Sequence, residues 1–384
     1  MFTILLLCII YISFISLGLP DSLLGSAWPS MYNLLNVPLH YAGIVSMIIS
    51  AGTVVSSIFC VRVLRRFGTG LVTMTSVFIT AAALIGFSFT QSFLFLCLLA
   101  VPLGLGGGAV DSALNNYVAL HYKARHMSWL HCFWGIGASL GPFIMSYFLI
   151  NKDSWNLGYR SIGIIQFCLV IILIISLPLW KKDVRTESSG KNDSISFKHI
   201  FSIPGVKQAV AVFFSYCSIE WIAGLWSASF LVTEKGIEPE FAAKWASLHF
   251  IGITVGRFIS GFITFKLTNR QMIRMGHIIM ACGIAVLVAP LNITPLAGLF
   301  LIGLGCAPIF PSMLHETPVN FGRENSQAIM GVQMGCAYIG SSVMPPIFGW
   351  FASIFSFSIF PFVIGAILIV KIFLVDSLYK KTSG

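Results

Sequence analysis

Long apolar stretches recur along the whole chain, and they constrain its fold more than any other feature. Of the 384 residues, 57% are hydrophobic and only 9% are charged, whereas a soluble domain usually carries about 25% charged residues. A helix of roughly 20 apolar residues crosses a bilayer. The composition therefore excludes a soluble globular protein and leaves no room for a large water-soluble catalytic domain.

Polar residues divide the chain into twelve apolar segments that are long enough to cross a membrane as helices. They lie at residues 3–28, 41–61, 71–89, 93–120, 127–150, 161–180, 207–232, 243–264, 275–290, 294–316, 328–352 and 357–378. The first segment has no Lys or Arg before its apolar core and no small-residue cleavage site, so we expect a spanning helix rather than a secretory signal. The prediction is an all-α membrane protein with twelve transmembrane helices.

Basic residues are distributed unevenly between the two sides of these segments. With the N-terminus in the cytoplasm, only four fall outside, namely Lys152, Arg160, Lys235 and Lys244. Seventeen fall inside, namely Arg62, Arg65, Arg66, Lys123, Arg125, Lys181, Lys182, Arg185, Lys191, Lys198, Lys207, Lys266, Arg270, Arg274, Arg323, Lys380 and Lys381. This bias predicts a multi-pass protein of the cell membrane with both termini in the cytoplasm. It also accounts for the net charge of +10 without a nucleic-acid partner.

The sequence contains no motif of an enzyme or a cofactor site. All nine cysteines fall in apolar stretches, with no C-x-x-C and no histidines at metal-ligand spacing. This pattern indicates neither a disulfide framework nor a zinc site. No nucleophile, histidine and acid set or phosphate-binding loop stands out, so we expect neither an enzyme nor a bound cofactor.

The chain divides into two similar halves. The longest polar stretch lies between the sixth and seventh segments, which predicts an N-terminal half at 1–180, a cytoplasmic linker at 181–206 and a C-terminal half at 207–384. Four pairs of residues match in the same order at an offset near 200, namely Asp21 with Glu220, Gly52 with Gly252, Gly104 with Gly303, and Pro142 with Pro345. We therefore expect two pseudo-symmetric six-helix halves that arose by duplication.

This organisation resembles the major facilitator superfamily, whose members carry their substrate site between two six-helix halves near the membrane midplane. The turn VLRRFGTG after the second segment resembles that superfamily's G-x-x-x-D-R-x-G-R-R loop through Arg66 and Gly68. It departs from the loop at Arg65, where the superfamily usually has Asp. The resemblance implies the major facilitator fold and transport by alternating access.

Four acidic residues lie within or at the ends of apolar segments: Asp21, Asp111, Glu220 and Glu316. A charged carboxylate at the bilayer centre costs about 2.5–3.5 kcal/mol on insertion scales, so each needs a partner or a water-filled cavity. A structural ion pair or a hydrogen-bonded helix end is the alternative at each position. Because desolvation favours the neutral acid, a carboxyl group in this setting can exchange a proton.

Asp21 and Asp111 have the most informative surroundings. Asp21 follows Gly18 and Pro20 in a stretch that predicts a bent or interrupted helix, and freed backbone groups are tolerated in a membrane only beside protein or a water-filled cavity. On a helix, Asp111 and Asn115 are four residues apart and share one face, which is too polar for lipid. We expect both carboxyl groups to face the central cavity.

The fourth segment also resembles a particular family. The sequence GLG at 104–106, followed by DSALNNYV at 111–118, is similar to the fourth helix of the fucose permease family of sugar:proton symporters. The resemblance implies that Asp21 and Asp111 are the proton and sugar sites. The fifth segment, SWLHCFWGIGASLGP, departs from that family because His131 and Trp134 stand where it has Gln and Asn. This departure argues against fucose itself.

Glycines are frequent in the same two segments. Gly104 and Gly108 form a small-xxx-small pattern, which is typical of close helix packing. The glycines of GIGASLGP, which are Gly135, Gly137 and Gly141, resemble a pattern of efflux members of the superfamily. We interpret both sets as helix-packing positions.

Sugar binding needs hydrogen-bonding amides or carboxylates and an aromatic face for the apolar side of the ring. The candidates are Asn115, Asn116, His131, Trp134, Glu220, Trp226, His249, Gln333 and Tyr338. A single membrane Trp or His often serves packing instead, and this alternative stays open for Trp226 and His249. Trp134 stands out because it lies only three residues from His131.

Arg257 and Glu316 lie toward the cytoplasmic ends of the eighth and tenth segments. We hypothesise that they form an ion pair that helps to close the inward gate, with plain structural pairing as an equal alternative.

Together these features predict a proton-coupled importer of a small polar solute, most plainly a monosaccharide, that works as a monomer among membrane lipids. Three alternatives keep the fold: an uncoupled or sodium-coupled carrier, an exporter of amphipathic compounds, and a membrane sensor that binds a ligand.

Overall fold

The computed structural model describes residues 2–122, 124–180, 200–263, 266–289 and 294–382. Within these ranges the chain forms helices and no strand. Most of the predicted linker lies outside the described residues, as do Lys123, Lys181, Lys182, Arg185, Lys191 and Lys198. Spatial contacts group the chain into two compact units, Met1–Thr186 with Ser227–Phe250, and Glu187–Trp226 with Ile251–Gly384. The predicted boundaries at 180 and 206 stay a prediction.

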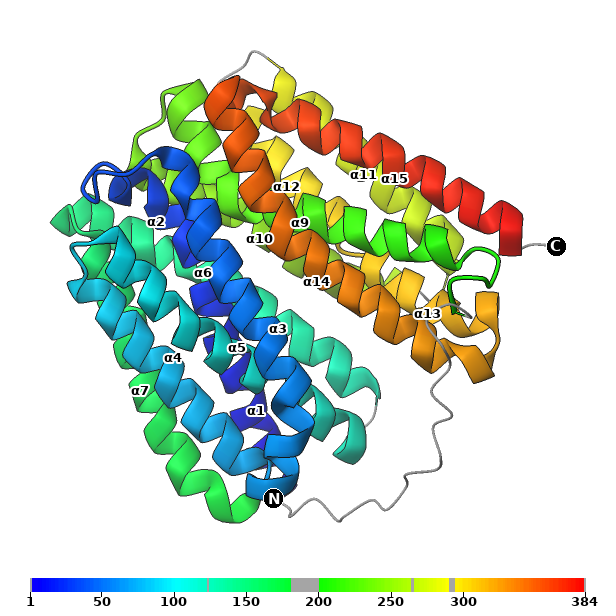
Figure 1. The fold of residues 1–384 in the computed structure, drawn as a ribbon, viewed down its shortest axis with the longest axis horizontal. Helices are drawn as coiled ribbons and strands as arrows, with labels where there is room; N and C mark the ends of the chain where they lie inside the picture. The colour runs from blue at the N-terminus through cyan, green and yellow to red at the C-terminus, as the bar shows by residue number, and fades with distance from the viewer. Residues whose placement is uncertain (1, 123, 181–199, 264–265, 290–293, 383–384) are drawn as a thin grey trace. The chain divides into compact units, whose positions relative to one another are not determined.

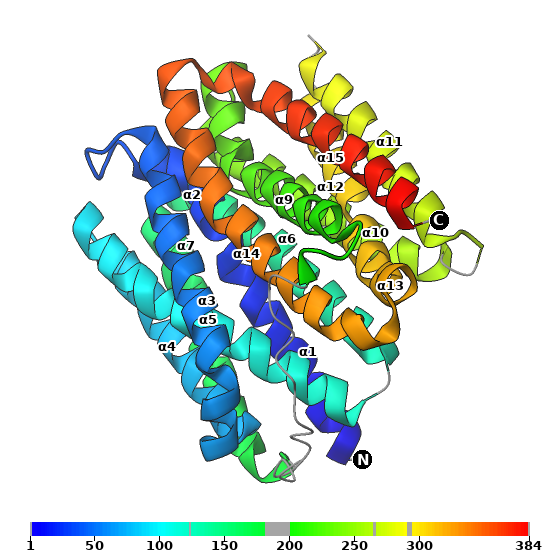
Figure 2. The same ribbon diagram turned by 45° about the vertical axis from the view of Figure 1, so that its right-hand side comes forward.

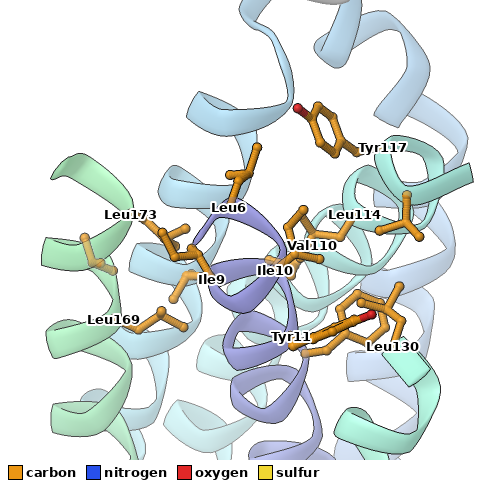
Figure 3. Close-up of a cluster of buried hydrophobic side chains, with 14 residues drawn as sticks. Leu6, Ile9, Ile10, Tyr11, Val110, Leu114, Tyr117, Leu130, Leu169 and Leu173 are labelled. Atoms are coloured by element: carbon orange, nitrogen blue, oxygen red, sulfur yellow. The ribbon is translucent and has the colours of Figure 1, made fainter. Parts of the chain in front are cut away.

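The first unit contains most of the N-terminal helices (Figure 1). They are α1 (Phe2–Asp21), α2 (Leu23–Met31), η1 (Leu39–Tyr41), α3 (Ala42–Phe67), α4 (Thr69–Phe89), α5 (Phe93–His121), α6 (Ala124–Lys152), α7 (Trp155–Ser176) and η2 (Leu177–Leu179). Helix α1 packs along α6, α3 along α5, and α4 along both α5 and α7. Apolar side chains of α1, α4, α5, α6 and α7 form a buried cluster, part of which Figure 3 shows.

The second unit is built from the C-terminal helices (Figure 2). They are α9 (Val206–Lys235) and α10 (Pro239–Ile263), whose segment Ser227–Phe250 groups with the first unit, followed by α11 (Asn269–Val288), α12 (Thr294–Cys306), α13 (Ile309–Phe321), α14 (Arg323–Ile354), η3 (Phe357–Ile359) and α15 (Phe360–Thr382). Helix α11 packs against α12, α13 and α15.

The described helices confirm the predicted class of fold. Among the described residues, eleven helical spans are long and apolar enough to cross a membrane. The remaining predicted segment, 328–352, lies in α14, which has 32 residues and contains Pro345 and Pro346. Helix α14 is long enough to cross a bilayer, although it is not among the eleven most apolar spans. The chain is an all-α, multi-pass membrane protein.

Two predicted segments are interrupted. The first breaks at Ser22, directly after Pro20 and Asp21, which confirms the expected interruption. The tenth was expected to be continuous over 294–316, but it consists of α12 and α13, which are separated at Ala307 and Pro308. Pro308 has no backbone N–H to donate to the preceding turn, which weakens the helix at this point, whereas α14 continues through Pro345 and Pro346.

Helix α11, which corresponds to the ninth predicted segment, begins earlier than its hydropathy predicts. It starts at Asn269 rather than near 275 because Thr268 and Gln271 form a reciprocal capping box at its N-terminus. The polar residues of this first turn lowered the apolar signal, although they are the ones that fix the start of the helix.

Glycines bring α1 and α6 into backbone contact. A Cβ atom on Gly18 would collide with the carbonyl oxygen of Trp134, and a Cβ atom on Gly137 would collide with that of Ile15. Each helix therefore needs a residue without a side chain at this crossing. The interpretation of Gly137 as a packing position is confirmed.

A second close crossing joins α5 to α3. A Cβ atom on Gly104 would collide with the carbonyl oxygen of Ile49, and one on Gly108 would reach the backbone of Thr53. The predicted small-xxx-small pattern is thus a packing surface. It fixes the depth and rotation of α5, the helix that carries Asp111.

We predict that Gly137→Ala lowers the stability of the protein, because its methyl group must push α6 away from the backbone of α1. Overpacking of this kind costs about 1–3 kcal/mol, and thermal unfolding of the purified protein measures the loss. Gly107→Ala is the matched control, since its methyl group would meet only Leu17 Cδ1, at 3.8 Å. Equal unfolding temperatures for the two variants would contradict the close crossing.

Candidate functional site

Asp21 and Trp134 form the best-defined polar contact of the first unit. Asp21 is the last residue of α1, and the crossing at Gly18 and Gly137 holds this end of the helix against α6. The indole Nε1 of Trp134 donates a hydrogen bond of 2.7 Å to Oδ2 of Asp21, and both side chains are half-buried. Two predicted site residues that are 113 positions apart therefore meet directly.

Asp111 has its partner on its own helix. Asn115 Nδ2 donates to Asp111 Oδ1 at 2.9 Å, which confirms that the two residues share a face of α5. The other polar atom of Asn115, Oδ1, is buried and has no hydrogen-bond partner among the described residues. Asn116 lies on a different face and is exposed. A buried amide oxygen without a donor is a position that a solute hydroxyl group can satisfy.

The two carboxyl groups of this unit share one property. Neither forms an ion pair with a basic side chain that the structure describes. Partial burial without a cationic partner favours the neutral acid. Asp21 and Asp111 therefore form an acidic pair whose hydrogen-bond donors, an indole and an amide, are neutral.

The other candidates of this unit have mainly aromatic neighbours. The half-buried ring of His131 lies edge-on to Phe14 of α1, with centroids 6.0 Å apart. His249 is fully buried on α10, where its ring meets that of Phe250 at 5.3 Å. Sequence reasoning missed the hydroxyl pair next to Asp111, in which Ser112 Oγ donates to Ser57 Oγ at 3.0 Å.

The predicted ion pair of Arg257 with Glu316 is wrong. Arg257 pairs instead with Glu220, at 3.5 Å between Nη2 and Oε1. Glu316 of α13 accepts a hydrogen bond of 3.0 Å from the hydroxyl group of Tyr379, and the guanidinium of Arg270 lies over the Tyr379 ring. Helices α9 and α10 follow each other in the chain, which favours contact between an acid on one and a base on the other.

Three further candidates lie in the second unit, and two of them are occupied by internal contacts. Trp226 is fully buried, and its Nε1 donates to the carbonyl oxygen of Pro345 at 2.8 Å. Gln333 is buried and accepts a hydrogen bond of 3.0 Å from Thr317. Tyr338 is half-buried on α14. The contacts of Trp226 and Gln333 are those of packed residues.

The structure adds a buried lysine that sequence reasoning missed. Lys371 of α15 is 0% exposed, and its Nζ lies 3.9 Å from Sδ of Met280 and 5.6 Å from the centre of the Tyr216 ring. The signal was present, since Lys371 is the one charged residue in the run VIGAILIVKIFLV. The rule that an ionisable residue inside a membrane deserves a functional hypothesis applies to lysine as well as to carboxylates.

Comparison with known families agrees with this architecture. The family model described as Major Facilitator Superfamily matches residues 10–345 and 209–383. The chain belongs to the major facilitator superfamily. It is therefore a transporter and not an enzyme, as the sequence predicted.

Relatives within the superfamily are distant. The glucose/mannose transporter GlcP of Bacillus subtilis is 21% identical over 356 residues, which cover 88% of this chain and 86% of that protein. The cis,cis-muconate transport protein of Acinetobacter baylyi is 23% identical over 345 residues, with 83% and 80% covered.

Solved structures share the fold of this facilitator. A D-xylose-proton symporter superposes with a TM-score of 0.76 at 12% identity, covering 99% of this chain and 97% of the other. A bacterial homologue of the human lysosomal transporter Spinster gives a TM-score of 0.74 at 12% identity, with 98% and 95% covered. At this identity the similarity concerns the fold alone.

We predict that Trp134→Phe destabilises the transporter, because Asp21 loses its indole donor while most of the aromatic packing remains. Leaving a partly buried acceptor unsatisfied costs about 1–3 kcal/mol, which thermal unfolding detects. Trp129→Phe on the same helix is the control, since Trp129 is 52% exposed. If both variants unfold at the wild-type temperature, the contact contributes nothing to stability.

We predict that Arg257→Gln costs about 3 kcal/mol, near the lower end for breaking a buried pair, because Glu220 is left without its cation and the Arg257 side chain is 18% exposed. The double variant Glu220→Gln/Arg257→Gln should recover most of this loss. Lys244→Gln, on an exposed position of α10, controls for the removal of a positive charge. A double variant no more stable than Arg257→Gln alone would speak against a coupled pair.

Proposed function

We propose that this facilitator imports a monosaccharide together with protons, by alternating access of its two halves, with both termini in the cytoplasm. The observation that carries the proposal is the pair of carboxyl groups, Asp21 and Asp111, with their neutral donors Trp134 and Asn115. A carboxyl group that relies on neutral donors can take up a proton without leaving a buried cation unpaired. This is the property that a proton-coupling site needs.

The same neighbourhood supports a sugar as the solute. The unsatisfied Oδ1 of Asn115 can accept a hydrogen bond from a hydroxyl group, and the half-buried rings of Trp134 and His131 offer aromatic surface. Two of the similar proteins carry sugar in their names, the glucose/mannose transporter GlcP and the D-xylose-proton symporter. Asn116, Glu220, Trp226, His249, Gln333 and Tyr338 remain proposed contributors to solute binding.

In the proposed cycle, protonation of Asp21 and Asp111 from outside neutralises both carboxyl groups and allows the sugar to bind. The loaded carrier then opens to the cytoplasm, where loss of the protons resets it. A solute shifts such an equilibrium only by binding one state better than the other. Asn115 and Trp134 supply that difference, because their hydrogen bonds depend on the charge of the carboxyl groups.

An organic anion is a second candidate solute. Arg257 is 18% exposed and pairs with Glu220 at 3.5 Å, and a guanidinium group suits carboxylate recognition. The similarity to a cis,cis-muconate transport protein agrees with this alternative. In this case the second unit, rather than Asp21 and Asp111, would determine which solute binds.

The experiment is uptake of labelled D-glucose into proteoliposomes under an imposed proton gradient. We predict that gradient-driven uptake falls by about tenfold or more in Asp21→Asn and in Asp111→Asn, because the amide cannot exchange a proton. Counterflow of labelled against unlabelled glucose should survive in at least one of them, since asparagine keeps the hydrogen-bond acceptor. Asp153→Asn, at an exposed position between α6 and α7, is the matched control.

Each other outcome identifies a rival. Uptake that ignores the proton gradient and survives both substitutions would disprove proton symport. Uptake that follows a sodium gradient would indicate sodium coupling, and efflux of amphipathic dyes would indicate an exporter. Transport of muconate instead of glucose, lost in Arg257→Gln, would establish the anion carrier, whereas binding of glucose without any flux would indicate a sensor.

A further inference from the structure

Lys371 is surrounded by groups from three other helices of the second unit. Its Nζ lies 5.6 Å from the centre of the Tyr216 ring, and Glu220 lies one turn farther along the same face of α9. The other titratable groups around it are Cys217 of α9, His277 of α11 and Cys306 of α12, and Arg257 of α10 holds Glu220. Only Glu220 and Arg257 in this set carry a full charge at neutral pH as free side chains.

These contacts leave a charged Lys371 poorly compensated. Glu220, the one carboxylate in this set, forms its ion pair with Arg257, and no described carboxylate lies within ion-pair distance of Lys371. A thioether and an aromatic ring are weak partners for an ammonium group. Burying a cation without a counter-ion costs several kcal/mol. The surroundings of Lys371 are therefore those of a neutral amine.

The first unit contains the corresponding arrangement with a neutral side chain. Gln166 of α7 donates to the carbonyl oxygen of Ser16 on α1 at 2.8 Å and accepts from Thr80 of α4 at 2.9 Å. Ser16 and Thr80 precede Tyr216 and Met280 by 200 residues each, and Gln166 precedes Lys371 by 205. The pseudo-symmetric helices thus meet at the same place in both units.

Gln166 and Lys371 occupy corresponding positions but differ in whether they can bind a proton. A fully hydrogen-bonded amide at position 166 meets the structural need of the three-helix contact in the first unit. An amine at position 371 makes poorer contacts, but it can bind a proton, which an amide cannot do near neutral pH. The property that distinguishes Lys371 from its counterpart is therefore proton binding.

We propose that Lys371 is a proton-binding site of the second unit that controls the Glu220–Arg257 ion pair. While the amine is neutral, Arg257 holds Glu220. When Nζ takes a proton from a hydronium ion, an N–H bond forms, water is released, and the new ammonium group competes with Arg257 for Glu220. Arg257 is then freed for another acceptor, and return of the proton to water restores the pair.

The length of the existing pair agrees with such a switch. Charge-assisted N–H to O contacts are usually about 2.7–2.9 Å long, whereas Arg257 and Glu220 are joined by a single contact of 3.5 Å. A loose pair can be redirected by one additional charge in its neighbourhood. This site is separate from Asp21 and Asp111, so it does not depend on which solute the carrier takes.

The test is thermal unfolding of the full-length purified protein between pH 6 and about pH 9.5, below the reference lysine pKa of about 10.4. An unfolded lysine holds its proton in this range and a folded one with a neutral amine does not, so unfolding takes up one proton at each pH where folded Lys371 is neutral. As the pH rises, the wild type should therefore become more stable relative to Lys371→Gln. Its unfolding equilibrium constant should fall by up to tenfold per pH unit relative to that of the variant. Lys380→Gln, at an exposed lysine of the same helix, should follow the wild type.

Two further variants keep the test decisive. Lys371→Arg carries a permanent charge and should lower the unfolding temperature throughout the range. Lys371→Met has an unbranched apolar side chain of similar length and replaces the glutamine variant if that one does not fold. Parallel pH profiles for the wild type and Lys371→Gln, or a wild-type profile for Lys371→Arg, would overturn the proposal.

A second measurement tests the control of the ion pair. Counterflow of D-glucose by wild-type proteoliposomes should vary with pH where folded Lys371 takes up its proton, which is where the stability difference from Lys371→Gln levels off, and Lys371→Gln should remove that variation. Unchanged pH dependence in the variant would limit Lys371 to proton binding without control of Glu220. The unfolding measurement needs no solute, so its result stands even if monosaccharide transport itself fails.

Discussion

The absence of water from the bilayer core is the constraint on which the structure depends. Every polar group at that depth must find its partner inside the protein, so each intramembrane contact is informative. The Trp134 bond to Asp21, the Asn115 bond to Asp111 and the Arg257 pair with Glu220 are three such solutions. Lys371 has only weak partners. A buried group of this kind lowers stability, and its proton chemistry is a reason for the chain to keep it.

Close packing of backbones determines which of these contacts can form. Without a hydrophobic driving force between helices in lipid, small residues permit the short approach that makes helix association favourable. Gly18 and Gly137 let α1 and α6 touch, and this crossing places the broken end of α1, with Asp21, against Trp134. The glycines have no chemistry of their own, but the position of the acid depends on them.

The fold was predictable because membrane insertion leaves a strong signal in hydropathy, and the acidic pair was predictable because charge in an apolar run is conspicuous. Two features were not. The partner of Arg257 depends on the rotation of three helices about their axes, which hydropathy does not encode, so the sequence does not distinguish Glu220 from Glu316. The break of the tenth helix at Pro308 required a decision between a kink and an interruption that a single proline does not settle.

The two units handle charge in different ways, although they share an architecture. In the first, carboxyl groups are held by neutral donors and a buried amide fills the three-helix contact at Gln166. In the second, a carboxylate is held by a guanidinium and an amine fills the equivalent contact. Adding a proton removes a negative charge in the first unit but adds a positive one in the second. The proposed proton sites of the two units therefore differ in kind, since one becomes neutral and the other becomes charged when it binds a proton, which a pair of identical halves could not provide.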